Sequence, residues 1–595
     1  MRNPSFAGAV RAVRLALAAA IAVVLLYTMH RALVLRVDYY DSYDYLRNAR
    51  ALLGDPSASY WELRPPFIPI VQLPATAIAM FSASASTMRV IAPHLTAAAL
   101  SILTVLSIFW VFRRPLGVTL ALLGTLLFVG TRYFVHYGAF GLADLASAGW
   151  TAATFALYAR ARSNPSPVAY VLGGVAFGCA ALTKYPLAVI GFALLLAEVA
   201  LSLREQKHDL RRWAGLVGIG VVGTMVFVGT QAAVLFALYP ADWPNLRGRL
   251  LLQLPTMSNW TAEPTESWRD HVPMAAVMMS IPTLLMSVVG LLVAIFRMQD
   301  RDIPFLAWLV VIGGTIVFVI GHNEARYLLP AVPAILYFAI RGLEAAAAML
   351  RTYWPWRPYA LSAGGGLVFL GSALWVGVDQ AIRDRDPVFR ADTERLAAQQ
   401  MSIVAGSQGR LLWFGHYHTL HAGWAGFVPH DDYFGTFHFG PIHVEYFTGR
   451  RFATRPQPWP ADPRLLSGLL RDGDAILRAA DTFYTALDLP AGGVPPMEVW
   501  SVRRLDLLRS ENGRFADHRR PELGIHLREA SGQLYARSEA IVGTWTLLAK
   551  STGDAELVAL GDVVFESDRE TLVGARPDAK IESLQLFHFD RTVFR

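Results

Sequence analysis

Cysteine and charged residues are both scarce in this sequence. The chain of 595 residues has a single cysteine, Cys179, so no disulfide can form within it and its compartment cannot be read from cysteines. Charged residues make up 17% of the chain and hydrophobic residues 54%, and the mean hydropathy is +0.37. Soluble globular domains carry about 25% charged residues. The scarcity of charge therefore excludes an ordinary soluble enzyme and indicates a polytopic membrane protein.

The formal net charge of +7 does not point to nucleic acid. Lysine and arginine lie mostly in short loops between apolar runs, where such residues set the orientation of a membrane protein. No glycine-rich segment is followed by the Gly-Lys-Ser/Thr of a phosphate-binding loop. We predict the lipid bilayer as a partner and no nucleic acid.

Apolar runs near the length of a membrane-spanning helix recur up to residue 378. They cover residues 12–37, 67–82, 88–112, 116–134, 145–159, 168–183, 186–203, 214–238, 273–296, 303–320, 327–343 and 358–378. If every run crossed the membrane, with the N-terminus inside, the basic clusters between runs would face outside, against the positive-inside rule. The run at 67–82 is the best one to exclude, because it is short, contains Pro69 and Pro74, and follows two further prolines.

The remaining runs predict a helical membrane protein with about 11 transmembrane helices and a cytoplasmic N-terminus. Residues 1–379 form the transmembrane domain, with an external loop at about 36–87. Residues 380–595 have the composition of a soluble domain and read as mixed α/β. The expected location is the inner, cytoplasmic membrane, with the loop and the C-terminal domain on the extracytoplasmic side.

The external loop carries a cluster of acidic residues that includes Asp41, Asp44 and Glu62. Asp41 begins a predicted helix, Ser42–Leu53, with Asp44 on the same face. Charges beside hydrocarbon are costly, so their clustering suggests a site. Asp41 is either an N-cap or a partly desolvated carboxylate that takes a proton from an acceptor hydroxyl, and the two roles are compatible.

Asp144 lies at the start of a later span, on the same predicted side as Asp41. It is either an ordinary interfacial residue or a second site carboxylate. Two carboxylates can share a divalent metal ion, or one can position the acceptor while the other acts as base. No metal-ligand motif accompanies them, so we assign no metal ligand and leave the cofactor open.

Arg64, Lys184 and Arg326 are the basic residues at the same membrane edge. Each alone is explained by a long side chain that reaches toward water or lipid headgroups. Together they supply the fixed positive charges that stabilise a departing lipid phosphate.

Five segments in order resemble the landmarks of C-type, membrane-embedded glycosyltransferases, especially the bacterial lipid A aminoarabinose transferase and protein O-mannosyltransferase group. They are DSYDYLRNARALLGD, ELRPP, GLADLASAG, ALTKYP and EARYLLPAVPAIL, within residues 10–345. The resemblance implies a polyprenyl-phosphate sugar donor, with Asp41 as the catalytic acid of the first loop and Asp144 as that of the second.

We expect six further residues to bind substrate, and the same resemblance implies this role for Arg64, Lys184, Arg326 and Tyr327. The other two are Asp44 and Glu62. Three positions depart from the family pattern. Ser42 follows Asp41 where the family often has a second acid, Arg64 replaces a lysine, and Tyr185 replaces a glycine after Lys184.

The soluble domain has a histidine-rich segment at residues 416–443. Its spacing matches no standard zinc motif, and aromatic residues are interleaved with the histidines. Metal binding, stacking on an acceptor sugar and ordinary loop packing all remain open for this segment.

The resemblance, with which these residues are consistent, implies a glycosyltransferase. It would move a hexose or pentose from a polyprenyl-phosphate donor to an extracytoplasmic hydroxyl of a cell-envelope glycan, glycolipid or protein, with inversion. The alternatives are a transporter or flippase for a lipid-linked sugar, which needs the cations but no base, and a non-catalytic binding protein.

Overall fold

The computed structural model describes most of the chain. The described residues are 4–36, 40–61, 64–82, 87–206, 209–240, 269, 271–320, 325–353, 358–385, 393–414, 419–422, 436–439, 441–453, 458–478, 497–509, 514–517, 520–552, 557–567, 569–575 and 580–594. The chain divides into two compact units. One contains the helices up to α17, and the other contains α18 and the large sheet.

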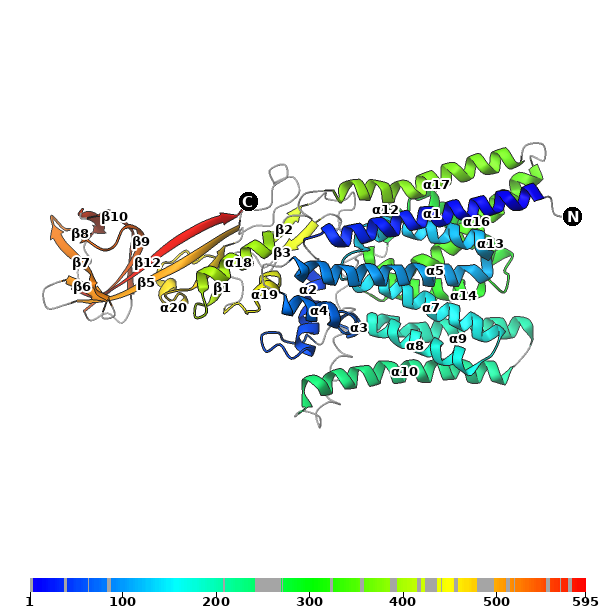
Figure 1. Ribbon diagram of the computed structural model, residues 1–595, viewed down its shortest axis with the longest axis horizontal. Coiled ribbons are helices and arrows are strands. Elements are labelled where there is room, and N and C mark those ends of the chain that lie inside the picture. The colour runs from blue at the N-terminus through cyan, green and yellow to red at the C-terminus, as the bar shows by residue number, and fades with distance from the viewer. Residues whose placement is uncertain are drawn as a thin grey trace. The chain divides into compact units, whose positions relative to one another are not determined.

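The first unit is a bundle of helices that run alongside one another (Figure 1). Its elements are α1 (Pro4–Val34), α2 (Tyr40–Leu52), α3 (Phe67–Val71), α4 (Leu73–Phe81), α5 (Met88–Val129), α6 (Arg132–Tyr137), α7 (Ala143–Ser163), α8 (Pro167–Thr183), η1 (Tyr185–Val189), α9 (Ile190–Glu205), α10 (Leu210–Leu238), α12 (His271–Met279), α13 (Ile281–Phe296), α14 (Ile303–Trp308), η4 (Leu309–Gly313), α15 (Gly314–Phe318), η5 (Ala325–Leu328), α16 (Val332–Tyr353) and α17 (Pro358–Arg383).

Six of the described helices are long and apolar enough to cross a membrane, and the bent pair α12–α13 adds a seventh if it forms one span. Helix α5 spans two of the predicted runs. Gly117 has a non-helical φ of 75° and divides α5 into two helical segments, which correspond to those runs. The excluded run forms two short helices, α3 and α4, of which the longer has 9 residues. At about 1.5 Å per residue, neither reaches across about 30 Å of hydrocarbon. The predicted total of crossings and their orientation stay predictions.

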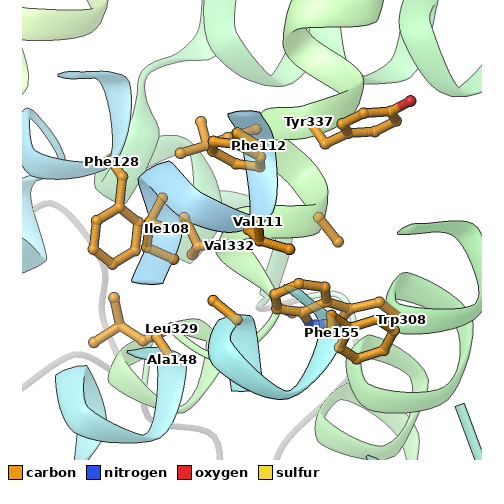
Figure 2. Close-up of a cluster of buried hydrophobic side chains, with 14 of the residues drawn as sticks. Ile108, Val111, Phe112, Phe128, Ala148, Phe155, Trp308, Leu329, Val332 and Tyr337 are labelled. Carbon is orange, nitrogen blue, oxygen red and sulfur yellow. The ribbon is translucent and has the colours of Figure 1, made fainter. Parts of the chain in front are cut away.

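A core of large apolar side chains lies inside the bundle. Phe155 of α7 stacks on Trp308 of α14 with ring centroids 4.5 Å apart, and Leu329 and Val332 pack in the same cluster (Figure 2). The indole nitrogen of Trp308 donates to the carbonyl oxygen of Pro330 at 2.8 Å. The core therefore fixes the chain immediately after η5.

Two helices of the bundle approach backbone to backbone. A Cβ atom on Gly290 of α13 would lie 1.8 Å from the carbonyl oxygen of Phe338 of α16. On the facing helix, a Cβ atom on Gly342 would lie 2.1 Å from the carbonyl oxygen of Met286. Only glycine allows this contact at these two positions, because any side chain would collide with main-chain atoms.

The remainder of the chain is rich in strands. Its elements are α18 (Thr393–Ala405), β1 (Leu411–Phe414), β2 (Thr419–Ala422), β3 (Thr436–Phe439), α19 (Pro441–Thr448), α20 (Arg464–Leu469), β4 (Ala475–Arg478), β5 (Met497–Arg509), β6 (Arg514–Asp517), β7 (Arg520–Ala530), β8 (Gln533–Ser538), β9 (Gly543–Ser551), β10 (Leu557–Phe565), β11 (Thr571–Ala575) and β12 (Ile581–Phe594).

The large sheet runs in the order β10-β9-β12-β5-β6-β7-β8-β11, and its neighbouring strands along this path are antiparallel where their pairing is described. Strand β4 joins it through β5, and β1 pairs parallel with β4. The helix α18 and the buried strand β1 lie at the start of this unit. The unit is nevertheless dominated by the antiparallel sheet, so the prediction of a mixed α/β domain understated its strand content.

Candidate active site

Helix α2 presents acidic residues from its first two turns. Asp41 lies in the first turn, where the positive end of the helix dipole favours a carboxylate, and Asp44 follows three residues later. Tyr45, one helical turn after Asp41, is buried with Ile68 of α3 and Ala143 of α7. This apolar contact brings the start of α2 against the start of α7, where Asp144 lies.

Arg64 joins the two acids of α2. Its Nη2 atom donates to Oδ1 of Asp41 and, at 2.9 Å, to Oδ2 of Asp44, while its Nε atom donates to the same Asp44 oxygen at 3.2 Å. Arg47, one turn after Asp44, pairs with its Oδ1 atom at 3.2 Å. Asp44 is therefore held by two guanidinium groups.

Arg326 reaches Asp41 from the far end of the transmembrane sequence. Its Nη2 atom donates to Oδ2 of Asp41 at 2.6 Å, and its Nη1 atom lies 4.0 Å from Oδ2 of Asp144. Lys184 follows α8 as its C-terminal cap and donates through Nζ to Oδ1 of Asp144. The result is a continuous network of charges that alternate in sign. In order, its members are Arg47, Asp44, Arg64, Asp41, Arg326, Asp144 and Lys184.

Two aromatic rings lie beside the cations. Nζ of Lys184 is 4.1 Å from the centroid of the Tyr327 ring, and the guanidinium of Arg326 is 5.6 Å from it. The Trp61 ring lies similarly near Arg64 and Arg47, at 4.9 Å and 5.6 Å. Such rings stabilise a cation while removing part of its water shell, so they make the cations available to an anionic ligand without full hydration.

The two acids of α2 differ in proton affinity. Burial favours the neutral form of Asp41, but Arg64 and Arg326 outweigh it and hold the pKa of Asp41 well below its ordinary value. For Asp44, burial outweighs the attraction of Arg64 and Arg47 and raises the pKa to about 6. Asp41 is thus a firmly ionised carboxylate, while Asp44 titrates near neutral pH.

Comparison with known proteins gives a family match within the helical unit and structural matches that extend over most of the chain. A family model described as dolichyl-phosphate-mannose-protein mannosyltransferase matches residues 64–231, which include Arg64, Asp144 and Lys184. ArnT from Cupriavidus metallidurans, solved bound to undecaprenyl phosphate, is 14% identical over 78% of this chain and 93% of that chain, with a TM-score of 0.54. The oligosaccharyltransferase AglB from Archaeoglobus fulgidus, solved with an inhibitory peptide and a dolichol-phosphate, is 11% identical over 84% of this chain and 74% of that chain, with a TM-score of 0.50.

The predicted resemblance to membrane-embedded glycosyltransferases is confirmed. The comparison with curated proteins gives no match. At these low identities, the likeness to the solved structures shows that the chain has the fold of the membrane-embedded glycosyltransferases, and the roles of its residues must be argued from their own geometry.

Within this glycosyltransferase fold, the structure brings most of the predicted site residues together. Asp41, Asp44 and Arg64 meet Arg326 and its neighbour Tyr327, and the Asp144–Lys184 pair continues the same network. Glu62 lies outside the described residues, as do the side chains of the histidine-rich segment 416–443. Among the described residues, no group of three or more potential metal ligands occurs.

Sequence reasoning missed Arg47, Trp61 and the role of Asn48 at this site. Arg47 is one helical turn from Asp44, and Trp61 is three residues before Arg64. Both residues could therefore have been predicted from the sequence as neighbours of the site. Asn48 lies one helical turn after Asp44 on the same face of α2, but its partner, the backbone of Trp61, lies across a loop. A loop conformation of this kind has no periodic signal.

Proposed function

We propose that this protein is an integral-membrane glycosyltransferase that moves a sugar from a polyprenyl-phosphate donor to an extracytoplasmic hydroxyl. The observation that carries the proposal is the position of Asp41 between Arg64 and Arg326. One site then holds a carboxylate able to accept a proton and guanidinium groups able to bind a phosphate. The family match supports a lipid-linked donor, as do the undecaprenyl phosphate bound to ArnT and the dolichol-phosphate bound to AglB.

In the proposed reaction, Asp41 takes the proton of the acceptor hydroxyl. The acceptor oxygen attacks the anomeric carbon from the side opposite the phosphate, and this direct displacement inverts the anomeric configuration. Arg64, Lys184 and Arg326 stabilise the charge that develops on the departing phosphate. Asp144 holds Lys184 and lies near Arg326, which makes it a positioning residue for both cations.

The remaining site residues have supporting roles in this proposal. Asp44 and Trp61 keep Arg64 in place, and Tyr327 lies beside Lys184 and Arg326. Glu62 is proposed as a further substrate-binding acid on its position in the loop. The transferred group is a hexose or pentose, and the acceptor is a cell-envelope glycan, glycolipid or protein at the outer face of the inner membrane.

A transporter or flippase for a lipid-linked sugar is the rival from another class. It would use Arg64, Lys184 and Arg326 to bind phosphate, but it has no use for a base. The two classes differ in their response to Asp41→Asn, which removes the proton acceptor and keeps the size of the side chain. A flippase would tolerate this change, and the proposed enzyme would not.

Mass spectrometry of cell-envelope glycans, glycolipids and glycoproteins tests the proposal. Strains with the gene, without it, and with the deletion complemented by Asp41→Asn are compared at equal protein expression. We expect one glycan modification to disappear on deletion and to remain absent with Asp41→Asn. Restoration by Asp41→Asn would refute Asp41 as the base, and unchanged glycans in the deletion strain would favour a non-enzyme.

A further inference from the structure

The two oxygens of the Asp41 carboxylate are divided between two arginines. Oδ1 accepts from Arg64 and Oδ2 accepts from Arg326. The side chains of both arginines are largely buried, with exposed fractions of 13% and 4%. In this state, the proposed base occupies the guanidinium groups that the donor phosphate needs.

This arrangement has two chemical consequences. A carboxylate bound by two guanidinium groups is a weak proton acceptor, because its negative charge is already stabilised. A phosphate that approaches the same guanidinium groups must compete with Asp41 for their N–H donors. Base strength and phosphate affinity are therefore linked through Arg64 and Arg326.

We propose that Arg64 and Arg326 are transferred from Asp41 to the donor phosphate as the reaction proceeds. This inference rests on the proposed glycosyltransferase function and concerns the order of events within its site. Donor binding first draws the two arginines toward the phosphate, which leaves Asp41 less stabilised and thus a stronger base. The Asp41 carboxylate, made more basic by donor binding, then takes the proton of the acceptor hydroxyl.

Charge is conserved at the site during this transfer. The O–H bond of the acceptor breaks and its proton goes to Asp41, while the acceptor oxygen forms a bond to the anomeric carbon. The bond between that carbon and the phosphate oxygen breaks, and its electron pair stays on the phosphate. The phosphate changes from a singly charged diester to a monoester with a second ionisable oxygen, in the same step in which Asp41 becomes neutral. The arginines therefore lose the negative charge of Asp41 in the step in which the phosphate gains a second one.

Two further acids keep the arginines in place when Asp41 releases them. Asp44 binds Arg64 through both Nε and Nη2, and Asp144 lies 4.0 Å from Arg326. The rings of Trp61 and Tyr327 lie within 6 Å of the same guanidinium groups, at 4.9 Å and 5.6 Å. Each arginine thus has a second carboxylate and an aromatic neighbour that do not depend on Asp41.

If the arginines are transferred in this way, an inactive variant that lacks the Asp41 carboxylate should bind lipid phosphate more tightly than wild type. Purified full-length protein in lipid nanodiscs is titrated with undecaprenyl phosphate as the probe. We expect Asp41→Asn to lower the Kd at least about tenfold at neutral pH and low salt, because Arg64 and Arg326 lose their anionic competitor. Asp41→Ser is a second variant in case the first is poorly folded, and it should change the Kd in the same direction.

Asp55→Asn is the matched control. Asp55 lies just after α2 and pairs with Arg50 at 2.6 Å, outside the site network. We expect its Kd to stay within about twofold of wild type, since Asp55 shares no described partner with the site network and changes at independent sites have separate effects. In addition, Arg326→Gln in the Asp41→Asn background should remove most of the gain.

The outcomes separate this inference from the proposed function. An equal or higher Kd for both Asp41 variants, together with loss of sugar transfer, would overturn the arginine transfer and leave the glycosyltransferase assignment standing. A failure of wild type and every variant to bind undecaprenyl phosphate would overturn the lipid-phosphate donor, and the arginine transfer with it.

Discussion

Asn48 holds the backbone of Trp61 at both of its polar groups. Its Oδ1 atom accepts from the Trp61 N–H at 2.7 Å, and its Nδ2 atom donates to the Trp61 carbonyl oxygen at 2.9 Å. The same carbonyl accepts from the backbone N–H of Arg64 at 3.2 Å. Asn48 is fully buried, so a side chain in the middle of α2 fixes the loop that delivers Arg64 to Asp41 and Asp44.

Asn48→Ala should therefore damage the site through Arg64. The Trp61 N–H loses its partner, at a cost of about 1–3 kcal/mol where water cannot replace it, and the Trp61 carbonyl oxygen keeps only its bond from the Arg64 N–H. Misplacement of Arg64 should reduce kcat about 10- to 100-fold. If Asn48 had a purely structural role, the losses in kcat caused by Asn48→Ala and by Arg64→Gln would be additive. We expect the loss in kcat to shrink strongly when Asn48→Ala is made in an Arg64→Gln background, as a double-mutant cycle measures. Full additivity would contradict a positioning role.

Arg64→Lys should be a severe change despite its retained charge. The guanidinium group bonds to both Asp41 and Asp44 through two nitrogen atoms, and a single ammonium cannot match this planar geometry. We expect sugar transfer to fall at least about tenfold, with Arg64→Gln lower still. Arg50→Lys is the control, because Arg50 lies on α2 with Asp41 and Asp44 but pairs with Asp55 and Ser57. Transfer by Arg64→Lys at the wild-type rate would mean that only the charge matters.

The sequence predicted which residues belong to this site better than it predicted their contacts. Hydropathy and basic loops predicted that Asp41, Asp144, Lys184 and Arg326 share one membrane face, because these signals are long and periodic. The sequence could not predict that Asp41 is bound by both arginines, since this depends on side-chain conformations in Arg64 and in η5. The sequence suggested a partly desolvated carboxylate ready to accept a proton, whereas in the structure both oxygens of Asp41 already accept hydrogen bonds from arginines.

The strand-rich C-terminal unit was harder to predict for a related reason. Strand β12 pairs with β5, so that Leu586 lies opposite Leu505 across a long stretch of chain. A single sequence gives no signal for such distant pairing, whereas α18 and β1 are detectable from local pattern.

Asp44 should make the stability of the protein depend on pH. Burial raises its pKa from 3.8 to about 6 in the folded state, so the folded chain binds this proton more tightly than the unfolded chain. The contribution is fully present at low pH and is lost as the pH rises through the folded pKa, by up to about 3 kcal/mol in total. We expect the thermal midpoint of wild type to fall relative to that of Asp44→Asn between about pH 5 and about pH 7. Parallel midpoints across this range would show that Asp44 does not titrate there.

The contact between α13 and α16 should tolerate no side chain at Gly290. Valine there would meet the Phe338 carbonyl oxygen at far less than contact distance, so the helices must separate. We expect Gly290→Val to abolish stable folding or to lower the thermal midpoint by more than about 5 °C. Gly366→Val on α17 is the control, because a Cβ atom there meets nothing within 4 Å. Similar midpoints for the two variants would contradict the close approach.

A buried ion pair joins α1, α6 and α17, and its removal should destabilise the bundle. Arg31 of α1 pairs with Asp384, directly after α17, at 2.8 Å, and Asp384 also contacts Nδ1 of His136 in α6 at 2.6 Å. Asp384→Asn leaves the Arg31 charge without its buried partner, which we expect to cost about 3–5 kcal/mol. The free energy of unfolding in mixed micelles measures this loss.

The half-exposed pair Arg204–Asp300 provides the control for that measurement. Its side chains are 45% and 58% exposed, so water screens the interaction. Asp300→Asn should therefore change the free energy of unfolding by less than about 1 kcal/mol. A second comparison uses Arg31→Met with Asp384→Leu, because replacing both members of a buried pair avoids the stranded charge and should recover most of the loss. Equal destabilisation by Asp384→Asn and by the double replacement would mean that the charge of Arg31 is not the cause.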